Sequence, residues 1–239
     1  MGGSVATESV IPAVLAAADN AIAWLLTVAV TTPGSPFAGH KLEELALEGG
    51  LVFVKKDGPG NGVPFQELLI GASLRQATGN GKSEGTLGNP KPSFSMHSFG
   101  CHFVEVTWQS EIARLRVGRV VTVMDAGRIV NPLTARNQIQ GAVVMGIGMA
   151  LFEHTTYDPQ NGAPINSNLA DYLVTVNADA PPIDVHFLDY PDKEINEHGG
   201  RGIGEIDMTG ITAAITAAVH HATGVYVREL PVKIENLIS

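Results

Sequence analysis

The stretch that decides the fold lies in the middle of the chain, from Phe94 to Met124. It contains two long runs, FSMHSFGCHFVEVTW at residues 94–108 and ARLRVGRVVTVM at residues 113–124. Apolar and polar side chains alternate along much of both runs, and this period of two is typical of half-buried β-strands. The short polar segment Gln109-Ser110-Glu111 joins them. The pattern therefore predicts a β-hairpin.

A long helix is predicted directly after the hairpin. Asn131-Pro132 opens it, because proline suits the first helical position, and apolar residues follow at helical spacing to about Phe152. The helix carries Gly141, Gly146 and Gly148, and each glycine costs about 0.5–1 kcal/mol relative to alanine in a helix interior. We expect close backbone packing at these glycines to offset that cost.

One strand and one helix are predicted in the last quarter of the chain. Apolar and polar residues alternate over Ile183 to Phe187, which indicates a half-buried strand. Thr209 can cap a last helix, Ile211 to Thr223, and Gly224 stands in the favoured position just after its end. A strand-like run, Val225 to Ile234, follows that helix.

The N-terminal third is expected to be a smaller assembly of helices and strands. Ser9 to Val30 is a mostly apolar helix by its spacing. Leu42 to Leu47 is predicted to be helical and Leu51 to Val54 to be a short strand. Pro64 is expected to start a further helical turn.

A polar segment rich in glycine and proline, residues 77–93, separates the two halves and is interpreted as a linker or surface loop. The predicted organisation is thus an N-terminal portion at residues 1–76, the linker, and a C-terminal portion at residues 94–239. The expected fold class is α+β, with mixed strands and packed helices.

Charge and cysteine content exclude several classes of protein. Lys and Arg total 15 against 24 Asp and Glu, a net charge of −9, and no basic stripe is present, so neither nucleic acid nor an anionic membrane is expected as a partner. The longest apolar run, Ala21 to Val30, is about half of the ~20 residues that span a bilayer. The single cysteine, Cys101, excludes an internal disulfide and a Cys-rich zinc or iron–sulfur site, and its place in an apolar strand predicts an inert core thiol.

The most unusual segment is Glu197-His198-Gly199-Gly200-Arg201-Gly202-Ile203-Gly204-Glu205. It is not a P-loop, because Glu205 stands where that motif has lysine. It offers a carboxylate on a glycine loop shortly before a helix, which is a candidate general base. The alternative is a tight turn with a solvated glutamate, and the spacing alone leaves both open.

Other polar residues give weaker signals. The histidines form no H-x-x-x-H pair, so metal ligation by protein side chains is not expected. Gln138 and Gln140 precede Gly141 on the predicted helix, where an exposed polar face is the simplest interpretation.

Three stretches resemble the C-terminal part of the large, molybdenum-binding subunit of the xanthine dehydrogenase and aldehyde oxidase family. Their order and spacing agree with that family from about Ser93 to the end of the chain, and more weakly from Gly2. Residues 168–172 and 201–206 look most like the bacterial periplasmic-type aldehyde oxidoreductases. The three stretches are SFGCHFVEV at 98–106 with MDAGRIVNP at 124–132, NQIQG at 137–141 with GIGMAL at 146–151, and RGIGE at 201–205 with ATGVYVRELP at 222–231.

The resemblance implies roles for individual residues. Glu205 matches the catalytic base that takes a proton from the attacking, water-derived oxygen. Gln138 matches the glutamine that hydrogen-bonds the molybdenum cofactor beside the metal, and Gly204 lies in the loop that lines it. The remaining match is at Gly2, Gly3 and Ser4, which look like the end of a glycine-serine segment that approaches the pyrophosphate of the cofactor.

The resemblance also implies a cofactor and partners. The cofactor is molybdopterin or its cytosine dinucleotide, with the metal held by the pterin rather than by protein side chains. An aldehyde or N-heterocycle is the implied substrate, and electrons leave through a [2Fe–2S] subunit and an FAD subunit. The family's large subunits are much longer, so the chain is expected to need the remainder of the large subunit for activity.

Two rival expectations follow from the residues and the length. The chain is either the C-terminal part of a molybdenum hydroxylase, or a truncated, non-catalytic fragment or partner-binding domain of the same fold. A fragment should expose an apolar patch where the rest of the subunit docks. The first residues carry no signal-peptide pattern, so the expected location is the cytoplasm, or the periplasm if a signal-bearing partner exports the complex.

Overall fold

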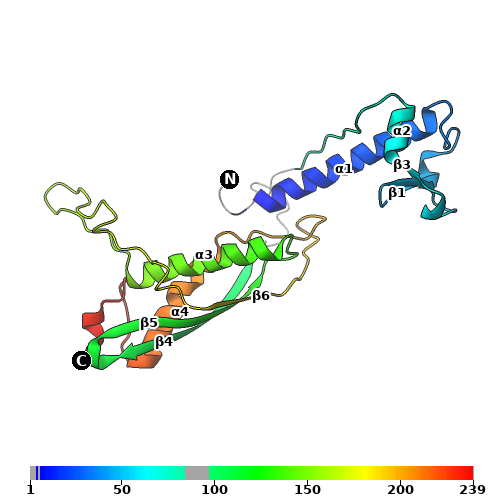
Figure 1. Ribbon diagram of the computed structural model, residues 1–239. Helices are drawn as coiled ribbons and strands as arrows, with labels where there is room; N and C mark the ends of the chain where they lie inside the picture. The colour runs from blue at the N-terminus through cyan, green and yellow to red at the C-terminus, as the bar shows by residue number, and fades with distance from the viewer. Residues whose placement is uncertain (1–3, 5, 84–96, 239) are drawn as a thin grey trace. The chain divides into compact units, whose positions relative to one another are not determined.

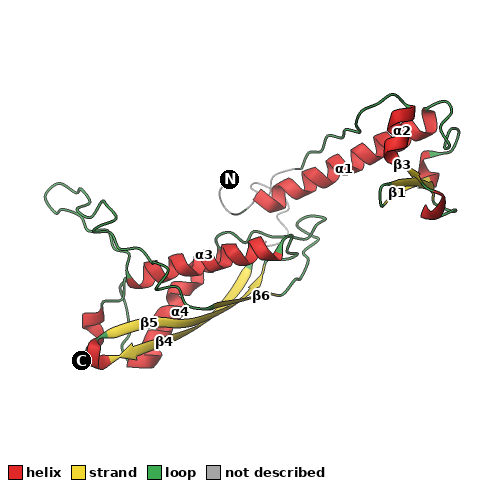
Figure 2. Ribbon diagram, in the orientation of Figure 1, coloured by secondary structure: helices red, strands yellow, loops and turns green. Residues whose placement is uncertain are grey.

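The computed structural model describes residue 4 and residues 6–83 and 97–238 (Figure 1). These residues form two compact units: the first holds residues 8–83, and the second holds residues 97–238 together with residues 4, 6 and 7. Each unit combines helices with a three-stranded sheet (Figure 2), so the fold class is α+β, as expected. Residues 77–83 of the predicted linker belong to the first unit, and residues 84–93 lie outside the described residues.

The sheet of the second unit is built on the predicted hairpin. Strands β4 (Phe99–Gln109) and β5 (Arg114–Asp125) pair antiparallel, with a bulge between Glu105 and Val106. The connection is the short helix η3 (Ser110–Ile112). Strand β6 (Ile183–Phe187) adds to β5 in parallel, which gives the order β4-β5-β6 and makes β5 the central strand.

Two helices bury one face of this sheet. Helix α3 (Pro132–Leu151) begins where expected, and the Asn131 side chain caps it by accepting hydrogen bonds from the backbone N–H groups of Leu133 and Thr134. Helix α4 (Ile206–Thr223) ends at Gly224, which is in the left-handed conformation. The core between sheet and helices includes the fully or almost fully buried side chains of Val120, Val143, Ile147, Ile211, Ile215 and Val219.

Close packing of α4 explains one of the three glycines in α3. A Cβ at Gly146 would lie 1.8 Å from Ile211 Cγ2 on α4, and one at Gly148 would lie 2.2 Å from Glu153 Oε1. Gly141 differs, because nothing lies within 4 Å of where its Cβ would be. The expectation of close backbone packing is therefore confirmed at Gly146, whereas the neighbours of Gly148 are side-chain ends; among the described residues the expectation is wrong for Gly141.

The first unit packs a long helix against a small sheet. Its elements are α1 (Ala6–Thr31), β1 (Leu45–Glu48), β2 (Leu51–Val54), β3 (Val63–Pro64) and α2 (Phe65–Gly71), with sheet order β1-β2-β3. The predicted helix, strand and helical turn that correspond to α1, β2 and α2 are thus confirmed. The core of the unit is formed by Leu25, Leu26, Ala29, Phe37, Leu45, Val52, Leu68 and Leu69.

The glycines of residues 77–83 let this extended segment lie directly on α1. A Cβ at Gly79 would be 2.0 Å from the carbonyl oxygen of Ala17, and one at Gly81 would be 2.0 Å from that of Ala13. The Asn20 side chain also donates a hydrogen bond of 2.7 Å to the carbonyl oxygen of Asn80. The polar, glycine-rich composition therefore reflects close packing against a helix.

Helix α1 is longer than the apolar run that the sequence suggested. Over its full length it meets the length and composition criteria for a helix that could cross a membrane, which core helices of soluble proteins also meet. Its last third carries Leu25, Leu26 and Ala29, which are buried in the first unit. The absence of a membrane partner stays a prediction.

Three predicted elements are wrong in type or extent. Leu42 to Leu47 is not a helix: a single 3-10 turn leads into β1, because the Gly49-Gly50 turn folds β1 back onto β2. Helix α4 starts at Ile206, five residues before the predicted start, and Thr209 lies inside it. The run Val225 to Ile234 forms no strand; it is irregular, and its Val232 N–H bonds the carbonyl oxygen of Ala150.

The expectation of a buried thiol at Cys101 is also wrong. Cys101 is exposed, because it lies on the face of β4 that the helices leave uncovered. Phe99 and Phe103 share that face and are 64% and 61% exposed. Phe99, Cys101 and Phe103 therefore form an exposed apolar strip on this face of β4, and docking of the rest of a subunit on it stays a prediction.

Candidate functional site

Backbone hydrogen bonds join the glycine loop, residues 197–205, to the residues that directly follow β5. Gly127 and Gly200 form an isolated antiparallel bridge, and the Arg201 N–H donates to the carbonyl oxygen of Ala126 at 2.8 Å. Glycine is required at Gly127, which has a φ of +68° and whose Cβ would lie 2.2 Å from the carbonyl oxygen of Gly199. The loop therefore runs as a short extension of the sheet before it enters α4.

An ion-pair cluster holds the middle of the loop. The mostly buried Arg201 guanidinium pairs with the carboxylates of Asp125, the last residue of β5, and of Asp192, the latter at 2.9 Å. One of its nitrogens also donates to the Asp125 carbonyl oxygen at 3.3 Å. Sequence reasoning gave Arg201 no role, and only its place in the glycine motif could have suggested one.

Glu205 lies at the end of the loop with its carboxylate exposed. It occupies the N-cap position of α4, yet its side chain makes no capping hydrogen bond. The Ser4 hydroxyl lies 3.4 Å from Glu205 Oε2, a long hydrogen bond. Among the described residues the carboxylate has no basic partner, so it is available to a ligand.

Ser4 also explains the two glycines that precede Glu205. A Cβ at Gly202 would lie 2.8 Å from the Ser4 carbonyl oxygen, and one at Gly204 would lie 3.0 Å from the Ser4 hydroxyl. The structure thus brings Ser4, Gly204 and Glu205 together, although Ser4 and Glu205 are 201 positions apart. Gly2 and Gly3, the other predicted residues of that segment, lie outside the described residues.

Gln138 lies on the second turn of α3 and is exposed. No hydrogen bond joins its side chain to another described residue. Its neighbour Ile139 is fully buried in a cluster with Met124 and Val185, and Ile203 and Ile206 pack against the same cluster. The turn that carries Gln138 therefore lies beside the glycine loop, and no hydrogen bond joins Gln138 to Glu205.

A buried polar pair lies directly behind Glu205, and sequence reasoning missed it. Asp207, in the first turn of α4, and Thr122, on β5, are both 0% exposed, and the Thr122 hydroxyl donates to Asp207 Oδ1 at 3.1 Å. Burial raises the pKa of Asp207 to about 6, against the opposing effects of the Thr122 and backbone hydrogen bonds. Its Oδ2 atom has no hydrogen-bond partner among the described residues.

His102 belongs to the same neighbourhood. It pairs with Thr122 across the β4–β5 ladder, and its ring lies against Gly210 in the next turn of α4. Burial lowers the pKa of His102, so the ring favours its neutral form. The buried Asp207 and the half-buried His102 thus both face the first turns of α4, directly after Glu205.

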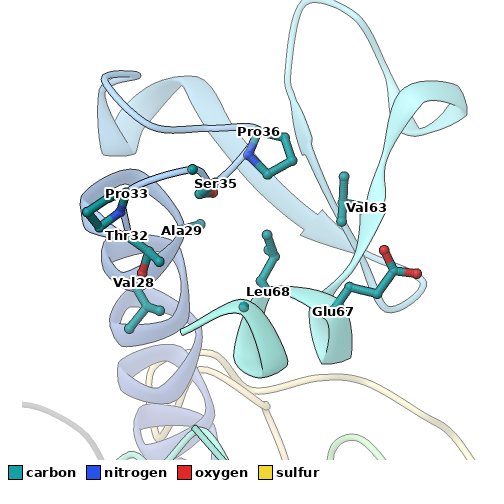
Figure 3. Close-up of a pocket in the computed structure, with 11 residues that line it drawn as sticks. Val28, Ala29, Thr32, Pro33, Ser35, Pro36, Val63, Glu67 and Leu68 are labelled. Atoms are coloured by element: carbon teal, nitrogen blue, oxygen red, sulfur yellow. The ribbon is translucent and has the colours of Figure 1, made fainter. Parts of the chain in front are cut away.

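An open pocket of the first unit contains none of the predicted site residues. It has a volume of about 200 Å³ and lies between α1, the turn at residues 32–36 and α2 (Figure 3). Its lining is mainly apolar, with Val28, Ala29 and Leu68 beside the single carboxylate of Glu67. No three His, Cys, Asp or Glu side chains come together as metal ligands within the described residues.

Comparison with known proteins identifies the family. The family model described as "Molybdopterin cofactor-binding domain" matches residues 1–181, so the chain belongs to this family. The resemblance to molybdenum-binding subunits of the xanthine dehydrogenase and aldehyde oxidase family is thereby confirmed. The matched region ends before Glu205.

Two relatives illustrate the sequence similarity to known molybdenum-binding subunits. The aldehyde oxidoreductase molybdenum-binding subunit PaoC of Escherichia coli K12 is 39% identical over 172 residues, which cover 70% of this chain and 24% of PaoC. The xanthine dehydrogenase molybdenum-binding subunit of Escherichia coli O157:H7 is 38% identical over 144 residues, covering 59% of this chain and 18% of that subunit. The chain therefore spans about a quarter or less of the length of these relatives.

Solved structures show the same fold. The Cu,Mo-CO dehydrogenase superposes with a TM-score of 0.80 over 100% of this chain and 29% of its own, at 18% identity. Quinoline 2-oxidoreductase from Pseudomonas putida 86 superposes with a TM-score of 0.67 at 28% identity, over 82% of this chain and 25% of its own.

Proposed function

We propose that this chain is the Glu205-bearing part of the large subunit of a molybdenum hydroxylase, which oxidises an aldehyde with oxygen derived from water. The observation that carries the proposal is the state of Glu205. Its exposed carboxylate caps no helix and pairs with no basic side chain among the described residues, and a glycine loop fastened to the sheet holds it in place.

The exposed residues around Glu205 suit a large polar cofactor. The loop offers backbone at Gly202 and Gly204, the Ser4 hydroxyl lies beside it, and the Gln138 amide has no hydrogen bond to a described residue. A pterin with a phosphate tail needs such donors and acceptors. We assign Gln138, Gly204, Ser4 and the preceding Gly2 and Gly3 to binding this group, which when bound supplies the centre that accepts two electrons from the substrate.

The chain's own contribution to the reaction is a proton transfer at Glu205. A Glu205 carboxylate oxygen accepts the proton of the attacking, water-derived oxygen as the new carbon–oxygen bond forms. The Ser4 hydroxyl can bond Oε2, which leaves Oε1 as the acceptor. In the overall reaction, one aldehyde and one water give one carboxylic acid, two protons and two electrons.

The substrate and partners are inferred from the relatives. PaoC is named as an aldehyde oxidoreductase subunit, which favours an aldehyde. Hydroxylation of an N-heterocycle is the alternative, because quinoline 2-oxidoreductase shares the fold at 28% identity. We propose that the remainder of the large subunit completes the site and that a [2Fe–2S] subunit and an FAD subunit carry the electrons away.

A second candidate is a non-catalytic fragment or partner-binding domain. The exposed sheet face with Phe99 and Phe103 favours it, since isolated domains seldom leave large apolar side chains together in water. This candidate predicts that the chain binds no molybdenum when it is recovered from its source cells.

The test is to purify the complex through a tag on this chain and to measure molybdenum per chain and turnover of aldehydes. We expect about one molybdenum per chain, and we expect Glu205→Gln to lower kcat by 10²-fold or more without loss of molybdenum. Glu197→Gln is the matched control, because Glu197 is an exposed glutamate at the other end of the same loop. Normal turnover of the Glu205→Gln complex would remove Glu205 as the base, and absence of molybdenum would favour the fragment.

A further inference from the structure

We infer that contacts with strand β5 hold both ends of segment 201–207 in place, an arrangement that we call the clamp. We further infer that Asp207 is a positioning residue for Glu205. The inference rests on the proposed function of Glu205 and deepens it. Among the described residues, the Glu205 carboxylate forms only one hydrogen bond, the long one with the Ser4 hydroxyl. The position of its carboxylate therefore depends on how firmly the backbone on each side is held.

The first end of the clamp is the ion pair between Arg201 and Asp125. Arg201 lies four residues before Glu205, and its guanidinium is mostly buried between Asp125 and Asp192. Asp125 is the last residue of β5. A buried charged pair holds its geometry firmly, because separating the partners would leave a desolvated charge unpaired.

The second end of the clamp is the hydrogen bond between Thr122 and Asp207. Asp207 lies two residues after Glu205, and both partners are 0% exposed. Thr122 is also on β5, three residues before Asp125. A buried carboxyl group that lost this partner would pay its full desolvation cost, so the bond resists opening.

The two contacts lie on opposite faces of strand β5. Side chains alternate along a strand, so Thr122 faces the buried side of the sheet, while Asp125 faces the other side. Segment 201–207 therefore passes around the carboxyl end of β5 and is held on both faces. Because β5 is paired with β4 on one side and β6 on the other, it is the most constrained strand of the sheet.

The catalytic consequence is geometric. Misplacement of a reacting group by about 1 Å can cost about 10²-fold in rate. Opening the clamp at Asp207 should therefore lower kcat by about 10- to 100-fold and leave KM and molybdenum content unchanged, because Asp207 is buried and touches no ligand. A residue needed only for folding would lower the yield of the complex instead.

The test combines exchange on the full 239-residue chain with kinetics on the purified complex. Thr122→Val removes the donor and keeps the volume, whereas Asp207→Asn keeps an oxygen acceptor for Thr122 and is the conservative variant. We expect hydrogen–deuterium exchange of amides 202–206 to accelerate at least tenfold in Thr122→Val and to stay near the parent rate in Asp207→Asn. In the complex, kcat should fall in the first variant and be largely retained in the second.

Arg119→Gln is the matched control, since it breaks an interaction of the same strand away from the loop. Arg119 pairs with Asp184 on β6, and both are exposed. Unchanged exchange of the loop in Thr122→Val would overturn the clamp whatever the kinetics show. Accelerated exchange with normal kcat, in a complex that Glu205→Gln inactivates, would overturn the positioning role. Full activity of Glu205→Gln would overturn the proposed function and the positioning role together, while the exchange result would still decide whether the clamp holds the loop.

Discussion

Replacing Asp207 with asparagine should change how the stability of the second unit depends on pH. Burial raises the pKa of Asp207 from its ordinary value of 3.8 to about 6. One pKa unit corresponds to about 1.4 kcal/mol, so the shift amounts to about 3 kcal/mol of preference for the protonated form in the folded state. The asparagine variant carries no charge at any pH and lacks this preference.

The sign of the effect follows from the raised pKa. The folded state binds the Asp207 proton more tightly than the unfolded state does, so the penalty for the buried charge is absent well below pH 4. The penalty grows as the pH rises toward 6 and is complete above it. The free energy of unfolding of Asp207→Asn, relative to that of the parent chain, should therefore increase by about 2 kcal/mol between pH 4 and pH 7, because part of the penalty is already present at pH 4.

Trp108 provides a local signal for the assay. The chain has two tryptophans, and Trp108 packs against the core of the second unit while Trp24 packs in the first. Urea unfolding of the full chain with Trp24→Phe, followed by fluorescence, therefore reports the unit that contains Asp207. The slope of free energy against urea should be equal in both chains if only stability has changed.

His102 is another titratable group that faces this part of α4, and it changes the free energy of unfolding with pH in the opposite direction to Asp207. Burial lowers its pKa, so stability falls as the pH drops below the ordinary histidine value of 6.5. This contribution is common to both chains and cancels in their difference. Asp184→Asn is the control: Arg119 lowers the pKa of that exposed carboxyl below its ordinary value of 3.8, so the effect of this substitution changes below about pH 4 and should stay nearly constant between pH 4 and pH 7. A difference between the Asp207→Asn and parent chains that stays constant from pH 4 to pH 7 would refute the reasoning.

Three alanine substitutions at glycines test the packing. Gly146→Ala should lower the free energy of unfolding of the second unit by about 1–3 kcal/mol, because its Cβ would lie 1.8 Å from Ile211 Cγ2. Urea unfolding followed by Trp108 fluorescence measures this change. An unchanged free energy would contradict the close approach. Gly141→Ala, on the same helix with nothing within 4 Å, should raise that free energy by about 0.5–1 kcal/mol, and a loss in the same assay would show that the site is crowded. Gly79→Ala should release residues 77–83 from α1 and accelerate their proteolysis, since its Cβ would meet the Ala17 carbonyl oxygen at 2.0 Å; protection equal to that of the parent chain would rule out the contact.

Local patterns predicted the elements of the second unit well because few alternatives satisfy them. Alternation with period two can be sustained over a long run only on a strand, and the hairpin β4–β5 followed. The Asn131-Pro132 pair combines a side-chain cap with a residue suited to the first turn, and α3 begins there. Gly224 ended α4 because glycine adopts the left-handed conformation at little cost.

The wrong predictions have a shared physical cause, which is pairing with distant residues. Leu45 to Glu48 became a strand because the Gly49-Gly50 turn placed it against β2. Helix α4 started early because Asp207 bonds Thr122 on β5, and no local pattern around Thr209 contains that bond. Period two showed that Cys101 shares a face with Phe99 and Phe103, but not which face the helices would cover.

Local sequence patterns were enough to predict the hairpin, the two long helices of the second unit and the glycine loop that ends in Glu205, since spacing and turn chemistry act over a few residues. The sequence motifs also pointed to the family that the comparisons then established. The surroundings of Glu205, in contrast, became visible only in the folded chain. Ser4 reaches it from 201 positions away, and Thr122 holds Asp207 from 85 positions away. Contacts over such separations depend on how sheet and helices pack, and the local pattern of residues does not encode them.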